Sequence, residues 1–397
     1  MNLKVIRGKK RRTTRILSGH PTRLRKIHQI LYNLDPLHSI PGFTTKKYSS
    51  LEYFIAFEHA SLSQHSINHS SLMARAKGRK SPSPEQLMKC CRSVSAEDMI
   101  THLNYALSMQ FKALPQNIRQ QLTKLGILII DFHQDCYYGK RDNPHVRTSR
   151  TKKSTNLFYE YLTADVYCKI GRFIIALLHR SEGKTLFTLT KKLIEYVKCV
   201  LTPKIIIFDG EFAVLDILAY FESQGFHYLG RKSQTKLVKT HKNRYYSGSN
   251  WEQRKQWREI ELRSKKAHNK RISTDICPQN VHGKMKFLIK SPKWEITLRY
   301  ADMLYSKRFN IETGYRDKHK FQIFTCTKIL STRLLLFLIA ILEWNCWEGV
   351  LIWVRALKLY SNDLPRNVLI QLTLNWTKTG IGELFEGALL PFRRGDE

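Results

Sequence analysis

The two stretches that decide the fold are LGILIID at residues 125–131 and KIIIFDG at residues 204–210. Each contains a short apolar run that is rich in β-branched residues, which favours a buried strand over a helix. Each run leads directly into an aspartate, Asp131 in the first stretch and Asp209 in the second. An acid at the tip of a buried strand is expected at the mouth of an α/β sheet, where sites of this class form.

The segments around these two strands have a regular order. Strands are expected at 157–167 and 172–179 on either side of Gly171, helices at 186–200 and 213–223, and a strand at 226–230. The predicted order β-β-β-α-β-α-β is that of a ribonuclease H-like domain. The fold class is therefore expected to be α/β, with a mixed sheet flanked by helices.

Changes in composition divide the chain into five regions. They are 1–120, a basic arm and a helical region for DNA binding or dimerisation; 121–232, the first part of the ribonuclease H-like domain; 233–293, a basic insertion that contains a strand; 294–360, helices that complete the domain; and 361–397, a C-terminal tail. Within the first region, Ser83-Pro84-Glu85 and Ala96-Glu97-Asp98 are typical helix starts. This pair of helices is a helix-turn-helix DNA reader, a helical cap or a dimerisation segment.

The chain is strongly basic. Among its 397 residues, 67 Lys and Arg stand against 32 Asp and Glu, a net charge of +35. Such an excess predicts a nucleic-acid partner, because phosphate contacts supply most of the affinity for nucleic acid. Charge does not distinguish DNA from RNA, or an enzyme from a binding protein.

Cysteine spacing and hydropathy argue against a zinc-binding, a secreted or a membrane protein. The eight cysteines include no C-x-x-C pair, which argues against a zinc site of ordinary spacing and favours a reducing cytoplasm. The basic N-terminus lacks the apolar segment of a secretory signal. The stretch 334–354 is apolar and long, but it contains Glu343, Asn345 and Glu348, so a buried core helix is expected and no membrane partner.

A third acid, Glu312, is a candidate for the same site as the two aspartates. Tyr305, Arg308 and Glu312 are three and four residues apart, so they share one face of a helix. Carboxylates on neighbouring strand tips together with this Glu could hold hard cations, which prefer carboxylate oxygen. The alternatives are a turn-forming Asp and a surface salt bridge.

These residues carry a resemblance to a known family. The stretches IIDFHQDCYYG (129–139) and IIIFDGEF (205–212), with Tyr305, Arg308 and Glu312, resemble the insertion-sequence DDE transposases that have a Tyr-Arg-Glu-Lys signature. The Lys position of the signature is held by His319, between Lys318 and Lys320. The family carries a strand-rich insertion before the catalytic Glu, which matches the basic region at 233–293.

The resemblance implies a metal-dependent function. Asp131, Asp209 and Glu312 would be the catalytic and metal-binding residues for two Mg²⁺ or Mn²⁺ ions in DNA cleavage and strand transfer. The residues expected to contact DNA are Tyr305, Arg308, Lys318, Lys320, Arg231 and Lys232. The implied partners are double-stranded DNA, as element ends and target, and a second copy of the chain in a synaptic complex. The implied setting is a prokaryotic cytoplasm, at the nucleoid.

Several assignments stay open at the level of sequence. Asp135, Asp142, Asp165, Glu211 and Asp317 are acids that compete for the places in the triad. His133 could support Asp131 or be structural, and Trp251 or Trp257 could stack on a base or pack in the core. The alternative functions are a catalytically silent or domesticated DNA-binding protein, a ribonuclease H-like nuclease without joining activity, and an RNA-binding protein.

Overall fold

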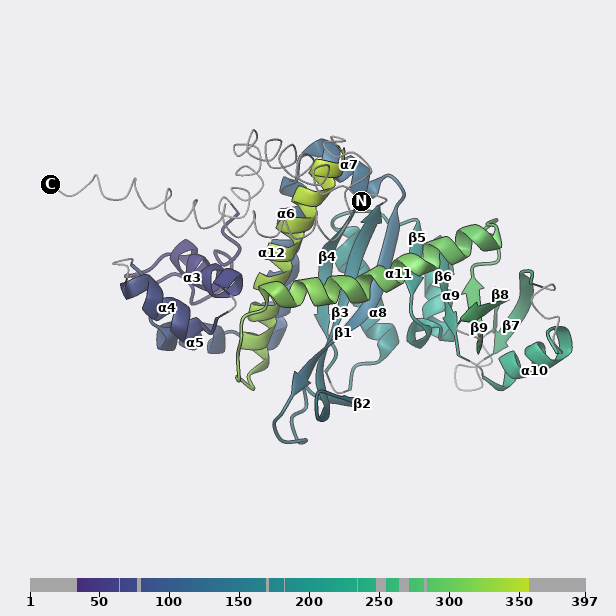
Figure 1. The fold of residues 1–397 in the computed structure, drawn as a ribbon, viewed down its shortest axis with the longest axis horizontal. Helices are drawn as coiled ribbons and strands as arrows, with labels where there is room; N and C mark the ends of the chain where they lie inside the picture. The colour runs from purple at the N-terminus through teal and green to yellow at the C-terminus, as the bar shows by residue number, and fades with distance from the viewer. Residues whose placement is uncertain are drawn as a thin grey trace, which may run out of the picture. The chain divides into compact units, whose positions relative to one another are not determined.

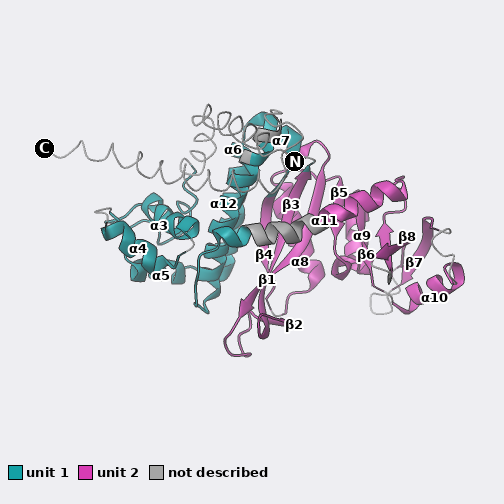
Figure 2. Cartoon of the chain, in the orientation of Figure 1, with its two compact units in different colours: residues 1–122, 168–173, 317–397 teal, residues 123–167, 174–316 magenta. Residues whose placement is uncertain are grey.

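The computed structural model describes two compact parts of the chain. It covers residues 34–63, 65–76, 80–168, 171–181, 183–233, 235–247, 255–263, 271–281 and 284–356, apart from the side chains of residues 284, 309–317, 350 and 353–356. Unit 1 takes residues 1–122, 168–173 and 317–397, and unit 2 takes residues 123–167 and 174–316 (Figure 2). The basic arm at the N-terminus, the C-terminal tail and Trp251 lie outside the described residues.

Unit 1 is helical. Its helices are α3 (Ser50–Ser63), α4 (Ile67–Ala76), α5 (Pro84–Arg92), α6 (Ala96–Ala113), α7 (Gln116–Thr123), the 3₁₀ turn η3 (His319–Phe321) and α12 (Leu330–Ala356). The two helix starts expected from sequence are confirmed, since Ser83 and Ser95 cap α5 and α6 by accepting from backbone N–H groups. A buried hydrogen bond joins helices α6 and α12. The side-chain amide of Gln110 in α6 donates to the backbone carbonyl of Leu342 in α12 at 2.9 Å.

Helix α12 forms the core of unit 1. Its stretch Leu330–Gly349 is long and apolar enough to cross a membrane, and it is buried throughout within the unit. Glu343 is fully buried there, and burial together with Glu58 raises its pKa well above the ordinary value. The expectation of a buried core helix at this place is confirmed.

Unit 2 is built on a mixed sheet of nine strands (Figure 1). The strands are β1 (Ile127–Tyr137), β2 (Arg147–Lys152), β3 (Thr155–Cys168), β4 (Gly171–His179), β5 (Ile205–Phe208), β6 (His227–Lys232), β7 (Arg258–Arg263), β8 (Arg271–Val281) and β9 (Lys284–Lys290). Their order is β2-β3-β1-β5-β6-β9-β8-β7, with β4 also paired to β3. Strands β1, β5 and β6 are parallel, and the α/β class is confirmed.

Helices cover both faces of the sheet in unit 2. They are α8 (Leu186–Lys198), the 3₁₀ turn η1 (Gly210–Phe212), α9 (Leu215–Ser223), α10 (Lys236–Tyr245) and α11 (Leu298–Lys318). Side chains alternate between the faces of a strand. Ile129 and Ile207 therefore pack in one cluster with Ala301 of α11, whereas Phe208 on the other face contacts Phe221 of α9, with ring centroids 5.8 Å apart. Figure 1 shows α11 lying across the sheet.

The structure extends two elements beyond their expected limits. Strand β1 does not end at Asp131, as its apolar run suggested, but continues to Tyr137 because β3 pairs with it over its whole length. The insertion contains α10, β7 and β8 besides the strand expected near 287–289, and β9 pairs antiparallel with β6. The insertion strands are thus part of the same sheet. Strand β2 was not predicted, because its polar residues lack the apolar alternation of a half-buried strand.

At Gly230 the pairing of β5 with β6 leaves no room for a side chain. It lies opposite Phe208 in the register, and a Cβ at this position would overlap the Phe208 ring. We expect Gly230→Ala to reduce the free energy of unfolding by about 1–3 kcal/mol, the usual effect of overpacking a core. Urea titration measures this, with Gly210→Ala as the control, because its nearest neighbour would be 3.6 Å from the new Cβ. An equal effect of both changes would contradict the packing argument.

Candidate active site

Asp131 and Asp209 lie at equivalent positions on adjacent parallel strands. The last parallel pair of β1 and β5 is Ile130 with Phe208, so each aspartate is the next residue along its strand. Adjacent strands are about 4.8 Å apart, which brings the two carboxylates close together. Asp131 remains within β1, and its Oδ1 accepts from the backbone N–H of Phe132 at 2.9 Å. Asp209 follows β5 and precedes η1.

Arg308 joins the two carboxylates. Its Nη1 donates to Oδ2 of Asp131 at 2.9 Å, and its Nη2 lies 3.7 Å from Oδ1 of Asp209. The guanidinium reaches them because the stripe of α11 with Ala301, Leu304 and Tyr305 packs on the sheet, and Arg308 continues that stripe. One cation thus balances two acids that approach it from different strands.

Tyr305 completes the contacts of α11 with the acids. Its hydroxyl donates to Oδ1 of Asp209 at 3.4 Å, and its ring is 2% exposed. Arg308 lies over this ring at 5.6 Å from the centroid, and Arg231 of β6 lies over it at 5.1 Å. Three of the residues expected at a DNA site, Tyr305, Arg308 and Arg231, are therefore together beside Asp131 and Asp209.

Burial governs the electrostatics of the pair. The Asp131 side chain is 12% exposed, whereas the Asp209 side chain is 45% exposed. Burial raises the pKa of the Asp131 carboxyl to about 7, although Arg308 acts in the opposite direction. Burial also raises the pKa of the Tyr305 hydroxyl, which is therefore a neutral donor at ordinary pH.

Glu312 is placed by the backbone of α11. The helix continues through Glu312 to Lys318, and the helical period puts Glu312 on the side of α11 that carries Tyr305 and Arg308. The Glu312 side chain is outside the described part of the chain.

The remaining basic residues singled out in the sequence lie in other surroundings. Lys232 of β6 donates to the carbonyl of Ala213, and burial lowers its pKa. Lys318 is buried in unit 1, with its Nζ 5.5 Å from the centre of the Phe337 ring. Lys320 in η3 is half-buried. The two lysines beside the signature position thus differ in their access to solvent.

The sequence did not single out Arg180. In the structure this residue neutralises Glu211, one of the acids that compete for a place in the triad. It forms ion pairs with Glu211 and with Glu160, the second at 3.3 Å. Its position directly after the apolar run of β4 is the signal that could have found it. Asp142 is exposed in the β1–β2 connection, and Asp165 lies in β3 opposite Ile129. The Asp317 side chain is outside the described part.

Two open assignments concern aromatic neighbours of the site. His133 is buried and stacks on Tyr161 with ring centroids 6.4 Å apart. Trp257 packs against the core cluster below α11, and its Nε1 donates to the Ile296 carbonyl at 3.2 Å. Both contacts are those of structural side chains.

The donor set of this site fits a hard divalent cation. Carboxylate oxygens are the ligands that Mg²⁺ prefers. Among the side chains that the structure describes, no three His, Cys, Asp or Glu residues form a metal-binding group. Asp131 and Asp209 would supply two ligands to such a cation, and a complete set would need a further donor.

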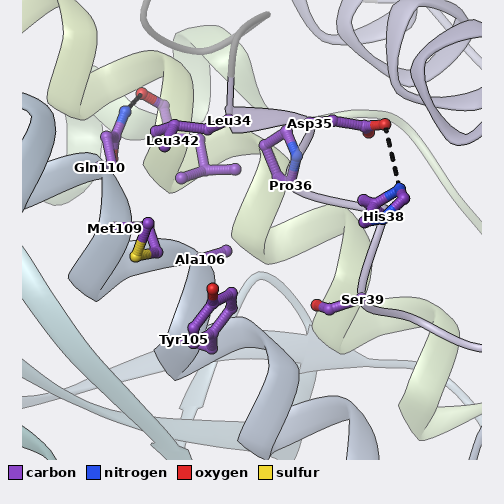
Figure 3. Close-up of a pocket in the computed structure, with 10 residues that line it drawn as sticks. All are labelled: Leu34, Asp35, Pro36, His38, Ser39, Tyr105, Ala106, Met109, Gln110 and Leu342. Atoms are coloured by element: carbon purple, nitrogen blue, oxygen red, sulfur yellow. Dashed lines mark hydrogen bonds and ion pairs between the residues drawn. The ribbon is translucent and has the colours of Figure 1, made fainter.

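A small pocket lies in unit 1 (Figure 3). It is lined by Leu34, Asp35, Pro36, His38, Ser39, Tyr105, Ala106, Met109, Gln110 and Leu342. Its volume of about 120 Å³ is below the range of about 300–1,000 Å³ that is usual for ligand sites.

Comparison with known proteins gives a likeness of fold. No protein family model matches the chain. A search of curated protein sequences finds no match either. Among solved structures, the chain is similar to piggyBac transposase in a cryo-EM structure of its synaptic complex with hairpin DNA, with a TM-score of 0.51 and 12% identity over 91% of this chain and 79% of that chain. At this identity the likeness shows a shared fold, so the chain has a transposase-like α/β fold.

Proposed function

We propose that this protein is a DDE transposase, which cuts DNA at the ends of a mobile element and joins those ends to a target. The observation that carries the proposal is the pairing of Asp131 and Asp209 by Arg308. These acids follow the last residue pair of adjacent parallel strands, and the helix that bridges them also carries Glu312. The fold shared with a transposase supports the same reading.

The arrangement of α11 supports the finer assignment to insertion-sequence transposases with a Tyr-Arg-Glu-Lys signature. Tyr305 and Arg308 both contact the acids, as members of one signature would. We assign the signature lysine to Lys320 in preference to Lys318, because Lys318 is buried beside Phe337 and Trp344. The parallel strands β1, β5 and β6, with β3 antiparallel to β1, support a ribonuclease H-like core.

Asp131, Asp209 and Glu312 would hold two Mg²⁺ or Mn²⁺ ions. When bound, such ions activate an attacking oxygen and stabilise the leaving oxygen in phosphoryl transfer. The protein itself positions the carboxylates through Arg308 and the Phe132 N–H. Arg308 and Arg231 add positive charge beside the acids, where the charge that develops on a phosphate would be stabilised.

The proposed partner is double-stranded DNA. The net charge of +35 favours binding to a polyanion. Joining two element ends would require at least two copies of the chain, so we propose a homodimer in the synaptic complex. The proposed setting is the nucleoid of a prokaryotic cell.

The test is metal-dependent cleavage of DNA that carries the flanking ends of this gene's own locus. Wild type is compared with Asp131→Ala, Asp209→Ala and Glu312→Ala, in Mg²⁺ and in Mn²⁺, and DNA binding is measured in parallel without metal. We expect wild type to nick the end-bearing DNA, and each variant to bind DNA but to lose nicking.

Each of the other possible results would indicate a different function or a different third acid. Binding without cleavage by wild type under either metal would favour a DNA-binding relic of a transposase. Cleavage that survives Glu312→Ala would mean that another residue supplies the third acid. Cleavage without joining of the freed ends would favour a nuclease.

A further inference from the structure

The far end of the sheet in unit 2 forms a projecting ribbon. It consists of residues 135–158, which include the end of β1, all of β2 and the start of β3, and it extends beyond the other strands (Figure 1). This ribbon is built on β1, the strand that carries Asp131.

The ribbon is rich in cations that face solvent. Between residues 138 and 155 its basic residues are Lys140, Arg141, Arg147, Arg150, Lys152 and Lys153. Asp142 is the single acid of that segment. All six basic residues except Arg147 are exposed, and Arg147 lies 3.7 Å from Glu160. The exposed Tyr138 lies among them.

The backbone at the tip of the ribbon presents one of these cations, Lys153, at a disfavoured position. Lys153 and Ser154 have φ angles of 46° and 64°, in the left-handed region where a two-residue hairpin turn usually has Asn and Gly. Strand β2 is bulged, because Ser149, Arg150 and Thr151 lie opposite Asn156 of β3. Bulges re-aim side chains, and non-glycine residues with positive φ concentrate at ligand contacts.

The tip is held in place by its own hydrogen bonds. Tyr138 donates its hydroxyl proton to the Lys153 carbonyl at 3.0 Å, and Thr155 donates to the Tyr137 carbonyl at 2.7 Å. Lys152 donates to Gln134 Oε1 at 2.8 Å. These bonds hold the backbone that carries the cations in one conformation before any partner binds, which reduces the entropy lost on binding.

We propose that this ribbon is a clamp for duplex DNA beside the acids, with Arg150 and Lys153 as phosphate contacts. The proposal rests on the proposed function, from which the DNA partner is taken. Thr163 of β3 pairs with Asp131, and the tip at Thr155 lies about eight residues away along β3, a distance of about 25 Å at a rise of about 3.3 Å per residue.

Protection of the sheet edge is the competing explanation for these charges. Lysines and bulges on an edge strand prevent pairing with other chains. In that case loss of the charges would promote aggregation and leave DNA binding unchanged. A test of binding therefore separates the two roles.

The test is DNA affinity of the full chain as a function of salt. The variant is Arg150→Ala with Lys153→Gly, and the control is Lys184→Ala with Lys191→Ala, which removes the same charge from exposed positions elsewhere in unit 2. The probe is a short mixed-sequence DNA duplex in EDTA, over about 50–200 mM salt. We expect affinity to fall about tenfold, and the log–log salt slope to become shallower by about 1.8 for two lost contacts.

Glycine at position 153 suits the positive φ, so the variant is expected to keep or raise its melting temperature while it loses affinity. An affinity and a slope equal to those of the control pair would overturn the proposal. Equal competition by an RNA duplex would overturn the assignment to DNA.

The readout is independent of catalysis. Weaker binding by the ribbon variant supports the clamp even if wild type does not cut DNA. A wild type that cuts DNA while the ribbon variant binds normally would remove the clamp and leave the proposed function standing.

Discussion

Asp131→Asn is expected to reduce metal-dependent DNA cleavage by more than about a thousandfold, because the amide is a poor metal ligand and carries no charge. The same change is expected to reduce the free energy of unfolding by only about 1–3 kcal/mol, because one hydrogen bond is lost while Arg308 keeps Asp209 as a partner. Asn has the shape of Asp, but its single side-chain oxygen can accept from the Phe132 N–H or from Arg308 and not from both, because these donors contact different oxygens of Asp131. Burial already raises the pKa of Asp131 to about 7, so the fold tolerates a neutral group at this place.

The measurement pairs initial rates of nicking in Mg²⁺ with urea titration in EDTA. Asp216→Asn is the control, since it removes an acid from the first turn of α9, away from the acid pair. Nicking at the rate of wild type by Asp131→Asn would remove Asp131 from the proposed site. A large loss of stability would instead assign the residue a structural role.

Arg308→Ala is expected to reduce the free energy of unfolding by about 3–5 kcal/mol at pH 8 without metal, the usual effect of removing one partner of a buried ion pair. Arg308 is 4% exposed, and its removal leaves the buried Asp131 and the nearby Asp209 without their shared cation. The loss is expected to be smaller at pH 6. A carboxyl whose pKa is raised to about 7 binds a proton as the pH falls below that value, and the neutral form needs no cation.

The sign of this pH dependence follows from proton binding. In the unfolded chain Asp131 loses its proton near its ordinary pKa of about 4, so between about pH 4 and 7 the folded state binds more protons than the unfolded state. Stability from this group therefore decreases as the pH rises through 7, and Arg308→Ala makes the decrease steeper. Urea titrations at pH 6 and pH 8 in EDTA measure it.

Two further variants make the argument about Arg308 specific. Adding Asp131→Asn to Arg308→Ala is expected to restore most of the lost stability, because the buried charge is then absent. Arg299→Ala, on the same helix but exposed, is expected to change stability by less than about 0.5 kcal/mol. A pH-independent loss in Arg308→Ala would show that the side chain stabilises the fold by packing alone.

The sequence was sufficient for the elements that bear the acids. Apolar runs before Asp131 and Asp209 predicted two buried strands, and the structure has β1 and β5 there, side by side and parallel. Runs of this kind are informative because a strand that is buried on both faces has no polar alternation. The spacing of Tyr305 and Arg308 likewise predicted one helix face, since the helical period depends on local backbone geometry alone.

Other features depended on pairings between distant segments. The end of β1 is partly exposed and β2 is mostly exposed, so neither has the apolar pattern that predicts a strand. Pairing with β3 makes both of them strands. The insertion extends the main sheet because β9 pairs with the edge of β6. Burial of Lys318 likewise follows from contacts with Phe337 and Trp344 of α12, which its own neighbours in the chain do not indicate.

The sequence by itself determined which residues could form the site: two acids after buried strands, and a Tyr and an Arg at helical spacing on a third element. Only the tertiary structure decided that Arg308 neutralises both acids, that Asp131 is buried while Asp209 is half exposed, and that Glu211 is paired with Arg180. The reason is physical. Strand and helix periods are local properties, whereas burial, ion pairing and the resulting pKa depend on which distant segments pack together.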